Sequence, residues 1–317
     1  MAIDALPVTK PRVQEQVAEE VLSRVGGTPL IRLRGVTRHL HPDVEVWGKA
    51  EWHNPSGSVK DRPAAFILRQ AFASGRLGRG RVLLDSTSGN MGIAYASFCA
   101  ALGIYLHLMV PANASPERLT LLRLLGARLT LTDPLEGTDG ARAAAIDEAA
   151  RDPDRYFFAD QYSNPANWQA HYQTTGPEIF EQTGGRVTHF VAGLGTTGTL
   201  TGAGRFLRQA GSRALLVAVQ PDGPMHGLEG LKHLATSPTP AIFDPTLPDM
   251  TVAVRTEDAH TMARRLAAEE GLLVGVSAAA AVVAALELAS GLERGVIVAV
   301  LPDSALKYLS EPFWRDE

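Results

Sequence analysis

Short apolar runs alternate with longer alanine-rich stretches along the 317-residue chain, and this alternation restricts the fold more than any other feature. Short apolar runs between turn residues are typical of buried strands, whereas apolar residues three and four positions apart are typical of helices. Strands are expected at 44–50, 82–85, 104–110, 128–132, 187–193, 214–220 and 295–301. Helices are expected near 61–74, 90–102, 115–125, 138–150, 165–183, 198–209, 257–270 and 277–290. This order predicts an α/β fold with mainly parallel strands.

The composition excludes several classes of protein. With 45% hydrophobic and 20% charged residues the chain can bury a large core, and we expect one or two α/β lobes. Its 30 basic and 34 acidic residues form no long block of one sign, so nucleic acid is not an expected partner. The N-terminal segment lacks the apolar core of a signal peptide and no apolar run reaches about eighteen residues, which argues against a membrane partner and for a cytoplasmic protein.

Cys99 is the only cysteine, and it lies in an apolar run. Neither an intrachain disulfide nor a cysteine-based metal site is therefore expected. The segment 222–250, with five prolines, is the longest irregular connection, and such connections are often functional loops.

Ligands bind parallel α/β sheets where the carboxyl ends of strands lead into helices, and three such junctions carry reactive or anion-binding groups. The turn-rich segment that begins with Asn54-Pro55-Ser56 runs into a predicted helix and places Lys60 at its first turn. A cation there opposes the helix dipole, so helix stability does not favour it. A surface lysine without a function is the other interpretation.

The second junction is Ser86-Thr87-Ser88-Gly89-Asn90, which follows a predicted strand and precedes an apolar helix. Hydroxyls and free backbone N–H groups at a helix N-terminus bind anions well. The same residue types also serve as ordinary helix caps, and this segment alone does not decide between a cap and a site.

The third junction is Gly193-Leu194-Gly195-Thr196-Thr197-Gly198-Thr199, where glycines allow close approach and threonines add hydroxyls, so a phosphate would be well held. The same glycines satisfy the dinucleotide fingerprint, with Asp222 placed as a ribose-binding acid. That alternative, a nicotinamide-dependent oxidoreductase, leaves Lys60 and the hydroxyl segment without a role. A lysine, an anion site and a phosphate loop together are what a phosphate cofactor that forms a Schiff base needs.

Six segments in this order resemble the cysteine synthase and cystathionine β-synthase family, over roughly residues 20–310, and the B-type cysteine synthases most closely. They are Gly26-Gly27-Thr28-Pro29-Leu30, the segment Asn54 to Arg62, Thr87-Ser88-Gly89-Asn90, Thr174-Thr175-Gly176-Pro177-Glu178-Ile179, Gly195-Thr196-Thr197-Gly198-Thr199 and Leu301-Pro302-Asp303-Ser304. The resemblance implies the two-lobed fold type II architecture, with pyridoxal 5'-phosphate as cofactor. It also implies a large cofactor-binding lobe of residues 1–53 and 164–317, a smaller mobile substrate-binding lobe of residues 54–163, and a homodimer.

The resemblance also implies the role of each site residue. Lys60 matches the Schiff-base lysine, which after its release is the natural base for the α-proton. Asn90 matches the asparagine that binds the cofactor's ring hydroxyl, and Gly195, Thr196, Thr197, Gly198 and Thr199 match the phosphate loop. Ser304 matches the serine at the pyridine nitrogen, unless a one-residue shift puts Asp303 there. Thr87, Ser88, Gly89 and Gln161 match the group that binds the substrate carboxylate.

A hydroxyl at the pyridine nitrogen cannot keep that nitrogen fully protonated, which favours prompt loss of a β-leaving group over a long-lived carbanion. Two departures from the family's usual sequence are Met91 in place of a threonine and Ser277-Ala278-Ala279 in place of Ser-Ser-Gly. A third is the cationic loop 225–233, in which Lys232 is a candidate for an anionic substrate or sulfur donor. A solvated loop lysine is the other interpretation of Lys232.

The function expected from the resemblance is replacement of the β-substituent of O-acetylserine or O-phosphoserine by a sulfur nucleophile, which gives L-cysteine. The small-molecule partners are then the amino acid and the sulfur donor. Cystathionine formation or another β-replacement is the nearest alternative. A serine or threonine dehydratase fits less well, because relatives of that kind carry more glycines in the phosphate loop, and a non-catalytic binding protein would have no need for Lys60.

Overall fold

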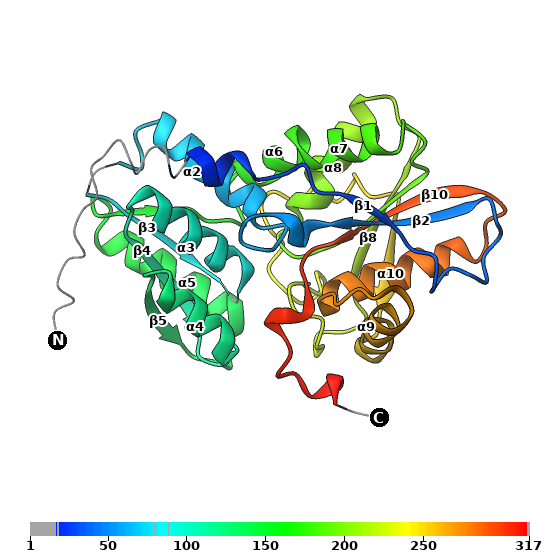
Figure 1. Ribbon diagram of the computed structural model, residues 1–317. Helices are drawn as coiled ribbons and strands as arrows, with labels where there is room; N and C mark the ends of the chain where they lie inside the picture. The colour runs from blue at the N-terminus through cyan, green and yellow to red at the C-terminus, as the bar shows by residue number, and fades with distance from the viewer. Residues whose placement is uncertain (1–16, 18, 79, 88, 316–317) are drawn as a thin grey trace. The chain divides into compact units, whose positions relative to one another are not determined.

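A computed structural model describes residues 17, 19–78, 80–87 and 89–315 (Figure 1). The chain divides into two units, of which unit 1 comprises residues 1–25 and 67–160 and unit 2 comprises residues 26–66 and 161–317. The lobe boundaries expected from the sequence follow residues 53 and 163. The segment 54–66, which carries Lys60, here groups with the larger unit.

Unit 2 contains a six-stranded sheet in the order β1-β2-β10-β7-β8-β9. Its strands are β1 (Leu30–Arg32), β2 (Val44–Ala50), β7 (His189–Gly193), β8 (Leu215–Pro221), β9 (Met250–Val254) and β10 (Gly295–Leu301). All neighbours pair in parallel except β1 and β2, which are antiparallel. The expected mainly parallel α/β fold is therefore confirmed.

Helices cover both faces of this sheet (Figure 1). One face packs on α9 (Thr256–Glu270) and α10 (Val276–Ala289), and its core includes Val191, Val217 and Ile297. The other packs on α7 (Thr175–Gln182) and α8 (Gly198–Gln209), through residues such as Phe190 and Val298, with α6 (Ala166–Gln173) packed on α8. Adjacent strand residues point to opposite faces, so both faces bury apolar side chains and the strands are apolar throughout.

Unit 1 contains a four-stranded parallel sheet in the order β5-β4-β3-β6. Its strands are β3 (Val82–Ser86), β4 (Leu106–Pro111), β5 (Arg128–Thr132) and β6 (Tyr156–Phe158). On one face α5 (Gly137–Arg151) packs against Met109, and on the other α3 (Asn90–Leu102) approaches Leu108. This unit also contains α4 (Pro116–Leu124), and α2 (Asp61–Ala73) begins in unit 2 and ends in unit 1.

Three strands were not expected from the sequence: β1, β6 and β9, each of which lies at the edge of its sheet. An edge strand is defined by pairing on one side only, so its own apolar pattern can be short. The helix expected at 165–183 is two helices, α6 and α7, which end and begin around Thr174. Pro177 has no N–H to donate to the carbonyl of residue 173, so one continuous helix would lose a hydrogen bond there.

Short 3-10 helices complete the structure: η1 (Glu51–His53), η2 (Ala305–Lys307) and η3 (Pro312–Trp314). The segment 222–249 contains no helix or strand, and all of its residues are described. Across the described ranges, no helix has the length and apolarity needed to cross a membrane.

Candidate active site

Lys60 lies at the end of a turn-rich segment, one residue before α2 begins, and its carbonyl already accepts the N–H of Ala64 at 3.0 Å. The segment pairs with the end of β10, because the Val59 N–H donates to the Pro302 carbonyl at 2.8 Å. Burial lowers the pKa of Lys60, and the carboxylates of Asp303 and Glu51 oppose that shift. A lysine with a lowered pKa has a larger fraction of neutral amine, the form that can bond to an aldehyde or accept a proton.

The glycine-rich loop 195–199 connects β7 to α8 and is packed too tightly to admit side chains at its glycines. A Cβ atom on Gly195 would lie 2.3 Å from the carbonyl oxygen of Gly230, and one on Gly198 would lie 2.0 Å from Asn167 Oδ1. Thr197 has a φ of 70°, in the left-handed region that few threonines adopt. The loop therefore has a constrained shape at the N-terminus of a twelve-residue helix, where an anion is stabilised.

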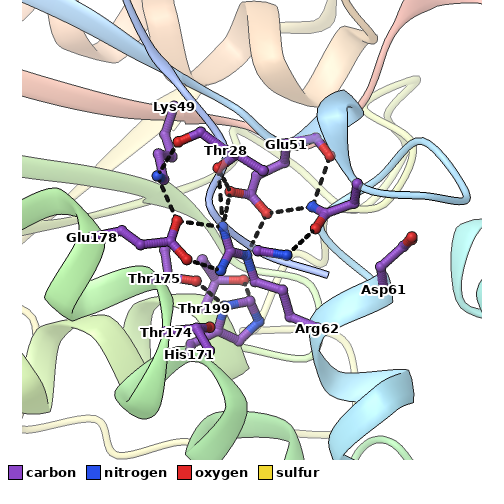
Figure 2. Close-up of polar contacts among 12 residues, drawn as sticks. Thr28, Lys49, Glu51, Asp61, Arg62, His171, Thr174, Thr175, Glu178 and Thr199 are labelled. Carbon is purple, nitrogen blue, oxygen red and sulfur yellow. Dashed lines mark hydrogen bonds and ion pairs between the residues drawn. The ribbon is translucent and has the colours of Figure 1, made fainter. Parts of the chain in front are cut away.

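Helix α6 holds this loop through two side chains one turn apart. Asn167 Nδ2 donates to Thr196 Oγ1 at 3.0 Å and to the Gln161 carbonyl at 2.7 Å. His171 lies between Thr175 and Thr199, with Nδ1 2.9 Å from Thr175 Oγ1 and Nε2 3.3 Å from Thr199 Oγ1 (Figure 2). Burial lowers the pKa of His171 well below its usual value, and the charges of Arg62 and Lys60 lower it further. The imidazole is therefore neutral, and the charge of Lys60 contributes to this state.

The loop fits a phosphate by its chemistry. The hydroxyl of Thr197 is buried and has no hydrogen-bond partner among the residues that the structure describes. A buried hydroxyl without a partner is costly, and a phosphate oxygen at the start of α8 would accept a hydrogen bond from it. Residues 196–199 therefore have the groups that a phosphate site needs.

Unit 1 carries the second predicted anion site. Thr87 Oγ1 accepts the N–H groups of Gly89 and Gly92 at 3.0 and 3.2 Å, so this threonine caps α3. Gly89 is backed by the buried Arg118, since a Cβ atom there would lie 3.0 Å from Arg118 Cδ. Asn90 is half-buried at the first residue of α3. Ser88 lies outside the described residues.

Gln161 and Lys232 are both buried in unit 2. Lys232 is 9% exposed, and its backbone N–H donates to the Leu194 carbonyl at 2.7 Å. Its side-chain ammonium lies 5.2 Å from the centre of the Tyr162 ring. Lys232 is therefore not a solvated loop residue. The segment 222–249 reaches the glycine-rich loop through Gly230 and Lys232.

Ser304 is half-buried and pairs with Val274, whereas the neighbouring Asp303 is fully buried and pairs with Ser58. The Tyr308 hydroxyl donates to Asp303 Oδ2 at 2.6 Å. Successive side chains of extended backbone point to opposite sides, so the side chains of Asp303 and Ser304 point in different directions.

A further hydroxyl, that of Ser277, was not predicted as part of the site. Ser277 is 7% exposed in the first turn of α10, two residues after Gly275. A Cβ atom on Gly275 would lie 2.1 Å from Asp303 Oδ1, so the start of α10 packs closely against Asp303. In the sequence, Ser277 stands out only because Ser277-Ala278-Ala279 differs from the Ser-Ser-Gly that is usual in the family.

The family of this chain follows from comparison with known proteins. Residues 21–303 match the family described as pyridoxal-phosphate dependent enzymes. A cysteine synthase of Aquifex aeolicus is 48% identical over 304 residues, covering 94% of this chain and 93% of that protein. The chain belongs to the pyridoxal-phosphate dependent enzymes, in the family of the cysteine synthases. A cysteine synthase B of Escherichia coli is 41% identical over 295 residues, covering 92% of this chain and 95% of that one.

Solved structures of this family share the fold. The cysteine synthase of Entamoeba histolytica has a TM-score of 0.90 and 31% identity, covering 100% of this chain and 94% of that one. An O-ureido-L-serine synthase has a TM-score of 0.86 and 37% identity, covering 94% of this chain and 96% of that one. The fold type II architecture and the pyridoxal phosphate cofactor expected from the sequence are therefore confirmed, and the dinucleotide interpretation of the glycine-rich loop has no support.

The predicted site residues fall into two groups. Unit 2 carries Lys60, Gln161, the loop 195–199, Lys232 and Ser304, and unit 1 carries Thr87, Gly89 and Asn90. Asn167 and His171, which hold the glycine-rich loop, were not predicted. Their spacing of four residues on one helix is a weak signal that many helices share.

Proposed function

We propose that the chain is a cysteine synthase, which replaces the activated β-substituent of O-acetylserine or O-phosphoserine with a sulfur nucleophile. Pyridoxal phosphate, when bound, supplies an aldehyde that bonds to amino groups and a ring that withdraws electrons from the substrate's α-carbon. One observation carries the proposal. In a chain of this family, burial lowers the pKa of Lys60, and the charge of Lys60 helps to lower the pKa of His171, which contacts the glycine-rich loop through Thr199.

The residues of unit 2 would hold the cofactor and move the proton. Thr196 to Thr199 would donate hydrogen bonds to the phosphate, and Lys60 Nζ would bond to the cofactor and, after substrate has displaced it, take the proton from the substrate's α-carbon. Either Ser304 or Ser277 would place a hydroxyl at the ring nitrogen. A neutral hydroxyl there leaves the ring a weaker acceptor of electrons than a carboxylate partner would.

The residues of unit 1 would bind the ring hydroxyl of the cofactor and the carboxylate of the substrate. Asn90 would hydrogen-bond the cofactor's ring hydroxyl, and Thr87, Ser88 and Gly89 at the start of α3 would bind the substrate carboxylate, as would Gln161 of unit 2. A carboxylate at a helix N-terminus is stabilised by the same free N–H groups as a phosphate.

The test is a comparison of wild type with Lys60→Ala. Wild-type protein should absorb near ~410 nm, lose that band on borohydride reduction, and carry the reduced cofactor on the peptide that contains Lys60. Lys60→Ala should lack the band and retain less than about a hundredth of cysteine formation, because it lacks both the attachment point and the base. Cofactor fixed to a different lysine would refute the assignment.

Turnover of O-acetylserine and O-phosphoserine with sulfide would then identify the leaving group. The second candidate is β-replacement with another nucleophile, which the resemblance to an O-ureido-L-serine synthase favours. Faster turnover with a nitrogen or oxygen nucleophile than with sulfide would select that alternative, and cystathionine formation is tested in the same assay with homocysteine.

We also propose that the enzyme acts in the cytoplasm as a homodimer, as its family resemblance implies. Light scattering during size-exclusion chromatography should give twice the mass of the chain. A mass equal to one chain over the working range of protein concentration would refute the dimer.

A further inference from the structure

Lys60 makes few contacts that would fix its own position. Its N–H lies 3.3 Å from Ser58 Oγ, a long hydrogen bond, and its side chain is only half-buried. The direction of the Lys60 amine therefore depends on how firmly the first turn of α2 is held.

Arg62, two residues further on, is completely buried and is held by two carboxylates (Figure 2). Its Nε and Nη2 donate to Glu51 Oε2 and Oε1 at 2.7 and 2.8 Å, a bidentate pair. Its Nη1 and Nη2 donate to Glu178 Oε1 and Oε2 at 2.7 and 2.8 Å, a second bidentate pair. Paired N–H groups restrict orientation as well as distance, so the guanidinium is fixed in its plane.

Each carboxylate is itself anchored to a different part of unit 2. Glu51, at the end of β2, accepts the Thr28 hydroxyl at 2.7 Å and Asn54 Nδ2 at 3.0 Å. Glu178, in the first turn of α7, accepts Lys49 Nζ at 2.7 Å and the Gly27 N–H at 2.9 Å. Although burial opposes it, the bonds and charge of Arg62 and Lys49 lower the pKa of Glu178 to about 2. Both carboxylates are thus ionised, and two cations balance two anions.

Stability alone is a poor explanation for this network. Removing four charges from water is costly, and apolar residues of similar volume often stabilise a core as well or better. Such networks are best understood where they select one conformation among several. Here the conformation selected is that of the segment around Lys60, because Arg62 joins that segment to β2 and α7.

The same helix also contacts the phosphate loop. Thr175, three residues before Glu178 on α7, bonds to His171, and His171 contacts Thr199 (Figure 2). Both ends of the cofactor site in unit 2 are therefore connected to α7, the phosphate loop through His171 and Thr175 and the Lys60 segment through Arg62 and Glu178.

We propose that Arg62 is a positioning residue, which through Glu51 and Glu178 holds Lys60 at the distance from the phosphate loop that its bond to the cofactor requires. The inference rests on the proposed function, since it assumes that Lys60 carries the cofactor. Arg62 touches neither cofactor nor substrate, and it acts through the backbone of α2.

The test separates cofactor binding from the reaction with Lys60. Pyridoxamine 5'-phosphate, which has no aldehyde, reports binding alone, and the growth of the band near ~410 nm after pyridoxal phosphate is added to cofactor-free protein reports the bond to Lys60. Glu178→Gln, which keeps the shape of the side chain, and Arg62→Lys, which keeps the charge, are the two variants. Either variant loses a bidentate pair and should form the bond between Lys60 and the cofactor roughly ten- to a hundredfold more slowly. This is the size of effect that a misplacement of ~1 Å produces. Binding of pyridoxamine 5'-phosphate should stay close to wild type.

The control is Ile179→Ala, which removes a fully buried side chain next to Glu178 without touching the network. It should lower the melting temperature and leave the rate of bond formation unchanged. Wild-type rates in folded Glu178→Gln or Arg62→Lys protein would overturn the inference, as would an equal loss in Ile179→Ala or a parallel loss of pyridoxamine 5'-phosphate binding. If one variant fails to fold, as judged by circular dichroism, the other decides. Cofactor bonded to a lysine other than Lys60 would instead refute the proposed function.

Discussion

Gly198 packs so closely on Asn167 that a Cβ atom at position 198 would lie 2.0 Å from Asn167 Oδ1. Protein atoms do not tolerate that distance, so a side chain at 198 must displace the Asn167 side chain, α6 or the glycine-rich loop. Asn167 also donates to Thr196, so the displacement would disturb two residues of the loop at once.

Gly198→Ala should therefore weaken cofactor binding. Loss of one or two hydrogen bonds to a charged phosphate is expected to raise the dissociation constant roughly ten- to a hundredfold. Titration of cofactor-free protein with pyridoxal phosphate measures this, with Gly223→Ala as the control, since a Cβ atom there meets nothing within 4 Å. Equal occupancy in Gly198→Ala and wild type would place the phosphate elsewhere.

Lys232→Ala should alter the choice of substrate. The ammonium is buried beside the Tyr162 ring, and a charge-assisted contact shielded from water contributes about 1.5–3 kcal/mol. The specificity constant for O-phosphoserine, or for a thiosulfate or thiocarboxylate donor, should fall roughly ten- to a hundredfold, and that for O-acetylserine with sulfide should change little. The control is His233→Ala, at the neighbouring half-buried residue. Equal losses on charged and uncharged substrates would show that Lys232 only shapes the loop.

Ser277→Ala and Ser304→Ala should differ in their effect on the bound cofactor. The hydroxyl that meets the ring nitrogen affects how far the ring withdraws electrons, so its removal should shift the absorption band and slow exchange of the substrate's α-proton. Because Ser277 is buried and Ser304 is only half-buried, we expect the larger change from Ser277→Ala. A change confined to Ser304→Ala would support the residue predicted from the sequence.

The stability of the protein should depend on pH through Asp61. Burial raises the pKa of this carboxyl from 3.8 to about 6, against the opposing effect of its hydrogen bonds from Ser56. A raised pKa means that the folded state holds the proton more tightly, so the stabilisation is complete below about pH 4 and is lost as pH rises through 6.

Asp61→Asn removes this titration. The free energy of unfolding of wild type, relative to that of Asp61→Asn, should fall by roughly 2 kcal/mol between pH 4 and 7, since each unit of pKa shift is worth about 1.36 kcal/mol and part of the change already occurs below pH 4. Urea denaturation of both proteins at several pH values measures the difference. A difference that is constant over this range would mean that Asp61 ionises as freely in the folded state as in the unfolded chain.

Local patterns in the chain were sufficient to predict most of the strands and the start of the glycine-rich loop. β2, β5 and β10 have the predicted bounds, and α3 and α8 begin where glycines and hydroxyl residues end a strand. These features depend on hydrophobic periodicity and helix capping, which act over a few neighbouring residues. Three of the four edge strands, β1, β6 and β9, were missed because their own apolar patterns are weak and partner strands define them, whereas the fourth, β5, was predicted from its alternating residues 128–132.

The sequence by itself determined the family and the cofactor, because these depend on ordered motifs that are recognisable without knowledge of the fold, and the same motifs predict Lys60 as the lysine that binds the cofactor. Only the tertiary structure revealed which side chains hold the segment around Lys60 in place. Arg62 and Glu178 are 116 residues apart, and nothing between them indicates that their side chains meet at 2.7 Å. A contact of this kind arises when strands and helices distant in sequence pack together, and it leaves no local period or spacing that a single chain could display.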